Sequence, residues 1–293
     1  MSFEFTDREK LRVALASVLG VKLDAIGHTD LAIIALLAAL HLLQLIPTAY
    51  VLLNRRHPRI RSHSPVLLTL MHASGMLYFV GDVATHEMMH PVGLLKNCIF
   101  VIVWLRAVLG LMATYSLLTT HATVVYFRNR SKDGAELGAW AVAAFALLGM
   151  SVNFAIGVTV SLLSTDRTVS FVTGIEVCQF HSGFKDAVVV LAWVCFLGLL
   201  LACAAANMLA ERGDGEAREL ARACTVLAAA MVLHTVVFYR MPRYPANLAW
   251  RAAVVCCDQA AWFAAWWLVM GPALARCMRD KRAERRGLLG GGK

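Results

Sequence analysis

Residues 31–53 read LAIIALLAALHLLQLIPTAYVLL, and this stretch decides the fold because its 23 residues include no charged side chain. With a rise of about 1.5 Å per residue, a helix of this length spans roughly 34 Å. The hydrocarbon core of a bilayer is about 30 Å thick. The stretch therefore predicts a transmembrane helix.

The composition of the whole chain also indicates a membrane protein. Of its 293 residues, 59% are hydrophobic and 16% are charged, whereas soluble domains carry about 25% charged residues. A soluble fold of this size would expose large apolar patches, which are rare on soluble monomers. This excludes a soluble globular enzyme, a disordered chain and a coiled coil. The net charge of +9 does not indicate nucleic-acid binding, because the basic residues lie in short loops between apolar runs.

Six further apolar runs follow the first one along the chain. They cover residues 65–84, 94–127, 139–163, 187–208, 220–239 and 252–275. Helices are expected because backbone polar groups in lipid must pair within their own segment. The alternating pattern of an outer-membrane barrel is not seen. The predicted fold class is therefore an all-α membrane protein, a bundle of seven transmembrane helices over residues 31–276.

Lys and Arg are unevenly distributed between the two sets of connecting segments. Residues 54–64, 128–138, 209–222 and 276–293 carry 17 of them, whereas the N-terminal segment and the remaining loops carry 10. Short loops rich in Lys and Arg stay in the cytoplasm. The bias predicts a multi-pass protein of the plasma membrane, with an extracellular segment 1–30 and a basic cytoplasmic tail 277–293.

The N-terminal segment has the pattern of a short amphipathic helix. Thr6 and Glu9 have the spacing of a capping box, and Leu11 and Leu15 then fall on one helical face. Arg12 interrupts the apolar run, and no cleavage site is evident after it. We expect a helix that lies on the membrane surface rather than a signal peptide.

Two of the eight cysteines lie on the predicted extracellular side. Cys98 is near the outer end of the third crossing, and Cys178 is in the longest outer loop. Because this side is oxidising, a Cys98–Cys178 disulfide is predicted, with two free thiols as the alternative. The bridge would hold the loop 164–186 across the mouth of the bundle. The other six cysteines are interpreted as small apolar packing residues.

Four ionisable residues lie at similar depth in the outer half of four different helices. They are Asp82, Arg106, His234 and Asp258. Charges inside a bilayer are costly and usually face the bundle interior, where Arg106 could pair with Asp82 or Asp258. We interpret them as the polar wall of a ligand pocket, with a structural ion pair as the alternative. Trp262 either lines the same pocket or only packs against helices and lipid.

The segment His86-Glu87-Met88-Met89-His90 matches the HExxH pattern of zinc metalloproteases. In that pattern two His on one helix face share a metal and the Glu is the general base. The motif falls where the second crossing leaves the membrane, Pro91 would stop the helix, and no third ligand is evident on that side. We therefore expect neither an enzyme nor a cofactor, and an intramembrane zinc hydrolase using His86, Glu87 and His90 is kept as an alternative.

Four segments carry a resemblance to a known family. They are residues 59–68 with Gly75, Cys98 with residues 115–120, residues 215–218 and residues 270–272. In this order they resemble the first inner loop with the second helix, the third helix, the third inner loop and the seventh helix of class C (metabotropic glutamate and GABA type) G-protein-coupled receptors, in the short form of fungal and protist relatives. There are departures. Thr120 and His121 stand where the family has a lysine, Ala273 replaces the lysine after the proline, and the sixth helix has no tryptophan.

The resemblance implies a receptor that binds a small ligand in the outer half of the bundle and signals to a heterotrimeric G protein, as a monomer or as a homo- or heterodimer. The basic inner loops would contact the G protein through Arg55, Arg56, Arg128, Arg130 and Arg218. Simple anchoring of the topology is the alternative role for each of these arginines. A small transporter is a further alternative, with Asp82, Arg106 and Asp258 on its path, although the absence of an internal repeat argues against it.

Overall fold

The computed structural model describes residues 7–20, 23–130, 138–163, 167–209, 215–240 and 247–290. In these ranges the α-helices are α1 (Asp7–Val18), α2 (His28–Leu53), α3 (Pro58–Arg61), α4 (Pro65–Thr85), α5 (Ala113–Arg130), α6 (Ala139–Leu162), α7 (Ser182–Met208), α8 (Gly215–Arg240) and α9 (Leu248–Gly290). The other elements are the 3₁₀ turn η1 (Gly93–Lys96), the π-helix η2 (Ile99–Met112) and the strands β1 (Val169–Val172) and β2 (Val177–Phe180).

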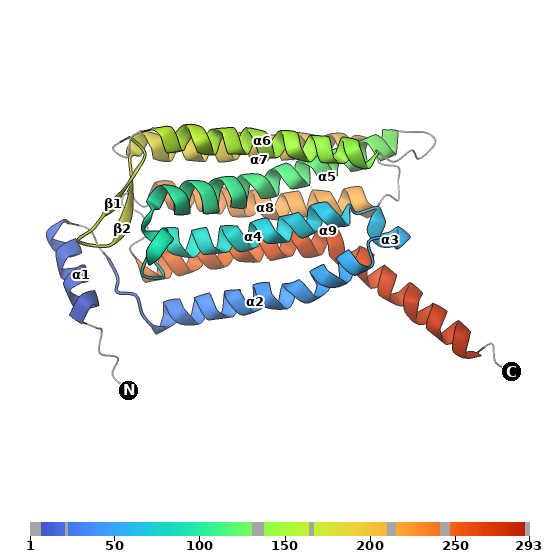
Figure 1. The fold of residues 1–293 in the computed structure, drawn as a ribbon, viewed down its shortest axis with the longest axis horizontal. Helices are drawn as coiled ribbons and strands as arrows, with labels where there is room; N and C mark the ends of the chain where they lie inside the picture. Colours follow the sequence, from blue (N-terminus) through green and yellow to red (C-terminus); the bar gives the residue numbers. More distant parts are fainter. Residues whose placement is uncertain are drawn as a thin grey trace.

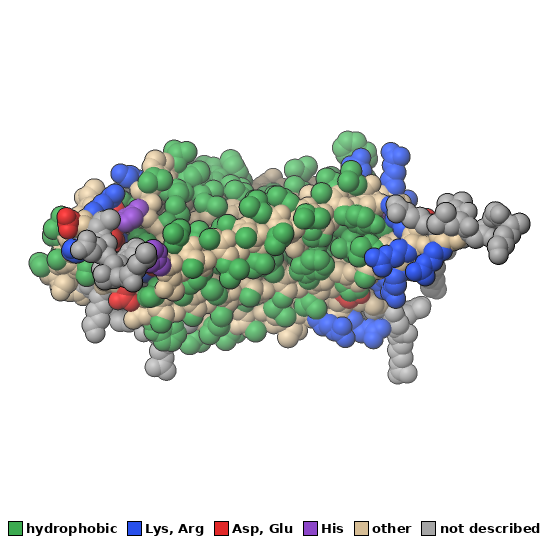
Figure 2. Space-filling model, turned by 90° about the horizontal axis from the view of Figure 1, so that it is seen from below, with side chains coloured by type: hydrophobic (Ala, Val, Ile, Leu, Met, Phe, Trp, Pro, Cys, Tyr) green, Lys and Arg blue, Asp and Glu red, His purple; other side chains and the backbone are tan. Residues whose placement is uncertain are grey.

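Seven helical segments of the described chain are long and apolar enough to cross a membrane: α2, α4, η2 with α5, α6, α7, α8 and α9. They lie side by side as one bundle, in line with the predicted all-α architecture (Figure 1). Figure 2 shows hydrophobic side chains over the middle of the bundle and Lys and Arg gathered at the end near α3 and the C-terminal part of α9. We call this the basic end, and the opposite end, at β1 and β2, the disulfide end.

Four crossings differ from the expected ranges by more than a few residues. Helices α7 and α8 each begin five residues before the expected start, at Ser182 and Gly215. The third begins at Ile99 and not at residue 94, because Gly93–Lys96 forms a separate 3₁₀ turn. Its first half is a π-helix, a rare geometry that is frequent at functional sites. The seventh continues as α9 to Gly290, through most of the expected tail, and projects from the basic end (Figure 1).

The disulfide end contains the predicted bridge between Cys98 and Cys178, which is confirmed, with Cα atoms 5.6 Å apart. Cys178 belongs to a β-hairpin in which Phe171 faces Cys178 and Val172 faces Val177. The sequence pattern predicts a loop here and gives no sign of the hairpin. The bridge joins β2 to the start of η2, so the hairpin lies against the end of the bundle (Figure 1).

Helix α1 also lies at the disulfide end, packed on the hairpin (Figure 1). Ala16 contacts Ile175, whereas Leu11 and Leu15 on the predicted apolar face are 61% and 38% exposed. The face that α1 turns to the protein includes the buried charged residues Glu9 and Arg12. The outward apolar face is the one that a helix on a membrane surface would give to lipid.

Candidate functional site

Helices α4 and η2 approach each other closely through glycines. A Cβ atom on Gly81 would lie 2.7 Å from the backbone nitrogen of Arg106, and one on Gly110 would lie 2.8 Å from the Cα atom of Tyr78. Small residues at such positions let helix backbones come together in a membrane. The close approach brings Arg106 next to Asp82, one residue after Gly81.

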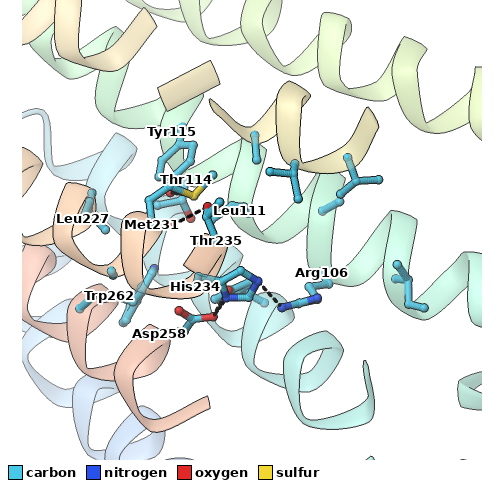
Figure 3. A pocket seen from close by; sticks show the side chains of 18 of the residues that line it. Arg106, Leu111, Thr114, Tyr115, Leu227, Met231, His234, Thr235, Asp258 and Trp262 are labelled. Carbon is cyan, nitrogen blue, oxygen red and sulfur yellow. Dashed lines mark hydrogen bonds and ion pairs between the residues drawn. The ribbon is translucent and has the colours of Figure 1, made fainter. Parts of the chain in front are cut away.

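The structure brings the four predicted ionisable residues into one continuous chain of contacts. Arg106 Nε donates to Asp82 Oδ1 at 3.1 Å, and Arg106 Nη2 lies 3.3 Å from His234 Nε2. His234 Nδ1 lies 2.8 Å from Asp258 Oδ2, which also accepts a hydrogen bond from the Tyr78 hydroxyl at 2.7 Å. Figure 3 shows the part of the chain from Arg106 through His234 to Asp258. Four helices are therefore joined by these contacts: α4, η2, α8 and α9.

Asp82 is the buried anchor of this chain. Its second oxygen accepts from Gln259 Nε2 at 3.4 Å, and its first oxygen lies 3.0 Å from His86 Nδ1. Burial lowers the pKa of His86, which favours the uncharged ring. Because His234 accepts from Arg106 through Nε2 and donates to Asp258 through Nδ1, it fits the neutral tautomer. This chain of contacts therefore contains two carboxylates, those of Asp82 and Asp258, and one guanidinium, that of Arg106.

A cavity of about 90 Å³ lies beside this chain, between η2, α5, α7, α8 and α9 (Figure 3). Its wall is mainly apolar, with Leu111, Leu227 and Met231, and its polar part is formed by Arg106, His234 and Asp258. Trp262 lines it as well, whereas Asp82 lies outside the lining and acts by holding Arg106. Phe180 from the hairpin reaches the same lining.

Two polar atoms around the cavity have no hydrogen-bond partner among the described residues. They are Thr114 Oγ1 and Trp262 Nε1. Both residues line the cavity, and each is only 3% exposed. Buried polar groups in proteins are nearly always hydrogen-bonded. Thr114 Oγ1 is therefore available to a bound molecule, whereas the indole edge of Trp262 that carries Nε1 packs against Gly75 of α4.

The HExxH segment does not have the helical geometry that its pattern predicts. Helix α4 ends at Thr85, and Glu87 adopts a left-handed conformation with φ 56°. Met88 N donates to Val83 O and Glu87 N to Ala84 O, which closes the helix in a Schellman motif. The zinc alternative requires both His on one helix face, and the end of α4 at Thr85 contradicts that requirement. In the described ranges of the chain, no group of three or more His, Cys, Asp or Glu could hold a metal.

Instead, the side chains of Glu87 and His90 bind α1 and the hairpin at the disulfide end. Arg12 donates to Ile175 O at 2.7 Å and to Glu87 Oε2 at 3.2 Å. His90 lies 3.1 Å from a carboxylate oxygen of Glu9 and 3.1 Å from one of Glu176. Burial raises the pKa of Glu87 to about 7 and outweighs the attraction of the nearby arginines. Nothing in the sequence pattern predicts this cluster.

At the basic end, the predicted G-protein contacts divide into two kinds. Arg55, Arg56, Arg130 and Arg218 are exposed. Arg128 is instead half-buried, and its Nη2 atom lies 2.5 Å from Glu216 Oε2 on α8. A second carboxylate of α8, Glu219, lies 3.3 Å from His63 and 3.5 Å from Arg276. These contacts join α5, α9 and the segment between α3 and α4 to α8 at the basic end.

Three other features were missed by the sequence analysis. Tyr78 could have been found, because it precedes Asp82 by four residues and so lies on the same helix face. Thr114 gave no signal, since a threonine in an apolar helix is common. Cys203 and Cys224 are buried in the core, as expected of packing residues, but the contact of their sulfur atoms, 2.6 Å apart between α7 and α8, was not predicted.

Comparison with models of known protein families gives no match, and comparison with curated protein sequences gives none either.

Proposed function

We propose that this chain is a seven-helix receptor of the G-protein-coupled type, which binds a small, mainly apolar amine in the cavity beside Arg106, His234 and Asp258. The observation that carries the proposal is a mainly apolar cavity whose polar wall links four membrane-spanning helices. Tyr78 of α4 also lines the cavity, so a ligand in contact with this wall can touch all four helices at once. If its affinity differs between two helix arrangements, it shifts the equilibrium between them.

The ligand class follows from charge and size. The polar chain has one more carboxylate than guanidinium, and Asp258 lines the cavity. A protonated amine would balance this charge, and buried charges are tolerated when they are paired. Thr114 offers a further hydrogen bond. A cavity of about 90 Å³ suits a molecule of few heavy atoms, since a dry cavity of about 150 Å³ binds benzene.

The topology supports an extracellular ligand and a cytoplasmic partner. Positively charged loops stay in the cytoplasm, which assigns the basic end to that side and the N-terminal segment to the outside of the plasma membrane. Arg55, Arg56, Arg130 and Arg218 are exposed there for contact with a heterotrimeric G protein. The disulfide then lies on the oxidising side.

The test is nucleotide exchange by purified heterotrimeric G proteins, with the full chain reconstituted in lipid nanodiscs. Short aliphatic amines are compared with alcohols of the same chain length. We expect exchange to rise with an amine and not with its alcohol. The Asp258→Asn variant should lose the response, whereas Asp186→Asn, an exposed carboxylate of α7 outside the cavity lining, should keep it.

A folded protein that fails to stimulate any G protein class, with any amine, would refute this function. A transporter is the second candidate, because a chain of ionisable groups through four helices also suits a solute path. Amine uptake into proteoliposomes without nucleotide exchange would favour the transporter.

A further inference from the structure

A second hollow lies on the outer surface of the bundle, away from the cavity. It is a groove of about 730 Å³ between α2 and α9. Its walls are almost wholly apolar, with Leu43, Pro47 and Tyr50 on one side and Phe263, Trp267 and Met278 on the other. Both helices are membrane-spanning candidates, so in a bilayer the groove faces lipid chains.

The groove runs along the helices toward the basic end. On α2 it extends from Leu40 to Tyr50, ten residues that correspond to about 15 Å of helix. On α9 it ends at Met278, one turn before Lys281. The groove is therefore elongated and apolar, and one end of it lies at the level of the basic loops. An acyl chain attached to a polar headgroup requires a site of this shape.

A fixed cation lies at the basic mouth of the groove. Lys281 donates to the Asn54 side chain, and its ammonium nitrogen lies 5.7 Å from the centre of the Tyr50 ring, which lines the groove. Arg55 and Arg56 follow on the next residues after Asn54 and are exposed. Of the neighbouring carboxylates, Asp280 is paired with Arg59 at 3.6 Å, and Glu284 is exposed one turn beyond Lys281.

We infer that this groove binds one anionic phospholipid, with an acyl chain between α2 and α9 and its phosphate group beside Lys281. The apolar walls would accept the chain of any lipid. The selectivity comes from Lys281, Arg55 and Arg56, because a basic residue near the membrane surface attracts anionic lipid by about 1 kcal/mol. A neutral phospholipid or a sterol would gain no such attraction.

The test is native mass spectrometry of the full chain, released from detergent after incubation with equimolar phosphatidylserine and phosphatidylcholine. We expect one retained phosphatidylserine per chain in preference to phosphatidylcholine. Lys281→Ala should lower the retained phosphatidylserine about fivefold, which corresponds to the attraction of one basic residue. Ala260→Phe, in the wall of the groove, should reduce retention of both lipids at this site.

Matched controls are available on other surfaces of the bundle. Arg130→Ala removes an exposed basic residue of α5, and Ala144→Phe adds an aromatic ring to an exposed position of α6. Both should bind phosphatidylserine as the wild type does. Equal retention of the two phospholipids by the wild type would overturn the inference, as would retention in Lys281→Ala equal to that in Arg130→Ala. Displacement of the phospholipid by added sterol would also overturn it. Lys281→Ala keeps the test decisive if Ala260→Phe fails to fold.

Discussion

Asp258 is the residue on which the polar wall of the cavity depends. One of its oxygens receives contacts from both Tyr78 and His234, and the residue also lines the cavity. Tyr78 comes from α4 and His234 from α8, so the carboxylate on α9 holds two other helices. A ligand that pairs with Asp258 would compete with both contacts. Through this one residue the ligand would therefore affect three helices: α4, α8 and α9.

The Tyr78→Phe variant isolates one of these contacts. It removes the hydroxyl that donates to Asp258 at 2.7 Å and keeps the ring in place. A hydrogen bond to a charged group contributes about 1.5–3 kcal/mol, so we expect the free energy of unfolding to fall by roughly this amount. Thermal unfolding in detergent micelles measures the change. Tyr126→Phe, in the last turns of α5, is the control and should change stability by less than about 0.5 kcal/mol.

Glu87 makes stability depend on pH, because burial raises its pKa from 4.5 to about 7. Between these two values the folded state holds a proton that the unfolded state has released. The free energy of unfolding therefore falls as pH rises from about 4.5 to 7, by at most about 1.4 kcal/mol per pH unit, and it levels off above that range.

The Glu87→Gln variant tests this assignment, since glutamine has the shape of the protonated acid and does not titrate. Its unfolding temperature, measured between pH 4.5 and 8, should show a weaker fall with pH than that of the wild type. Glu284→Gln, an exposed carboxylate of α9, is the control and should leave the wild-type slope unchanged. Parallel slopes for Glu87→Gln and the wild type would contradict the role of Glu87.

At the scale of elements, the contact between α4 and η2 has almost no room for side chains. The Gly81→Ala variant would place a methyl group 2.7 Å from the backbone nitrogen of Arg106, where neither helix can move without its neighbours. Overpacking of this kind costs about 1–3 kcal/mol, and it would also separate Arg106 from Asp82. We expect a lower unfolding temperature and weaker amine binding.

Gly198→Ala is the matched control, because a Cβ atom at that position of α7 meets no heavy atom within 4 Å. Alanine also has a higher helix propensity than glycine, by up to about 1 kcal/mol. This variant should therefore unfold at the same temperature as the wild type or at a higher one. Similar losses of stability in both variants would show that the packing of α4 against η2 is not specific.

Sequence patterns predicted the level of a residue along its helix better than the direction in which its side chain points from the helix axis. The level of a residue along a helix follows from counting residues at a constant rise. The contacts of His234 with Arg106 and with Asp258 agree with the similar level predicted for these three residues. Rotation about the helix axis is set by packing, so the pairing of Arg128 with Glu216 could not be predicted from composition and spacing alone. The Schellman end of α4 was also missed, because it needs a left-handed residue and Glu87 is an uncommon choice there.

At the scale of the whole molecule, two helical segments connect the cavity to the basic end. Arg106 and Arg128 lie on the continuous span of η2 and α5, and His234 and Glu216 lie on α8. The two segments are in contact through Arg106 with His234 near the disulfide end and through Arg128 with Glu216 at the basic end. If the continuous span of η2 and α5 moves relative to α8 at the cavity, the contact between Arg128 and Glu216 at the basic end therefore changes as well.

The Glu216→Gln variant tests this connection within the proposed receptor function. The substitution removes the negative charge that lies 2.5 Å from Arg128 and weakens the link between α5 and α8. If that link stabilises the inactive arrangement, its loss shifts the equilibrium toward the active one, and couplings of this kind are commonly worth about fivefold or more. We expect nucleotide exchange without ligand to rise by about that factor in nanodiscs. Glu284→Gln should keep the wild-type rate, and a lower rate in Glu216→Gln would mean that the pair supports the active arrangement instead.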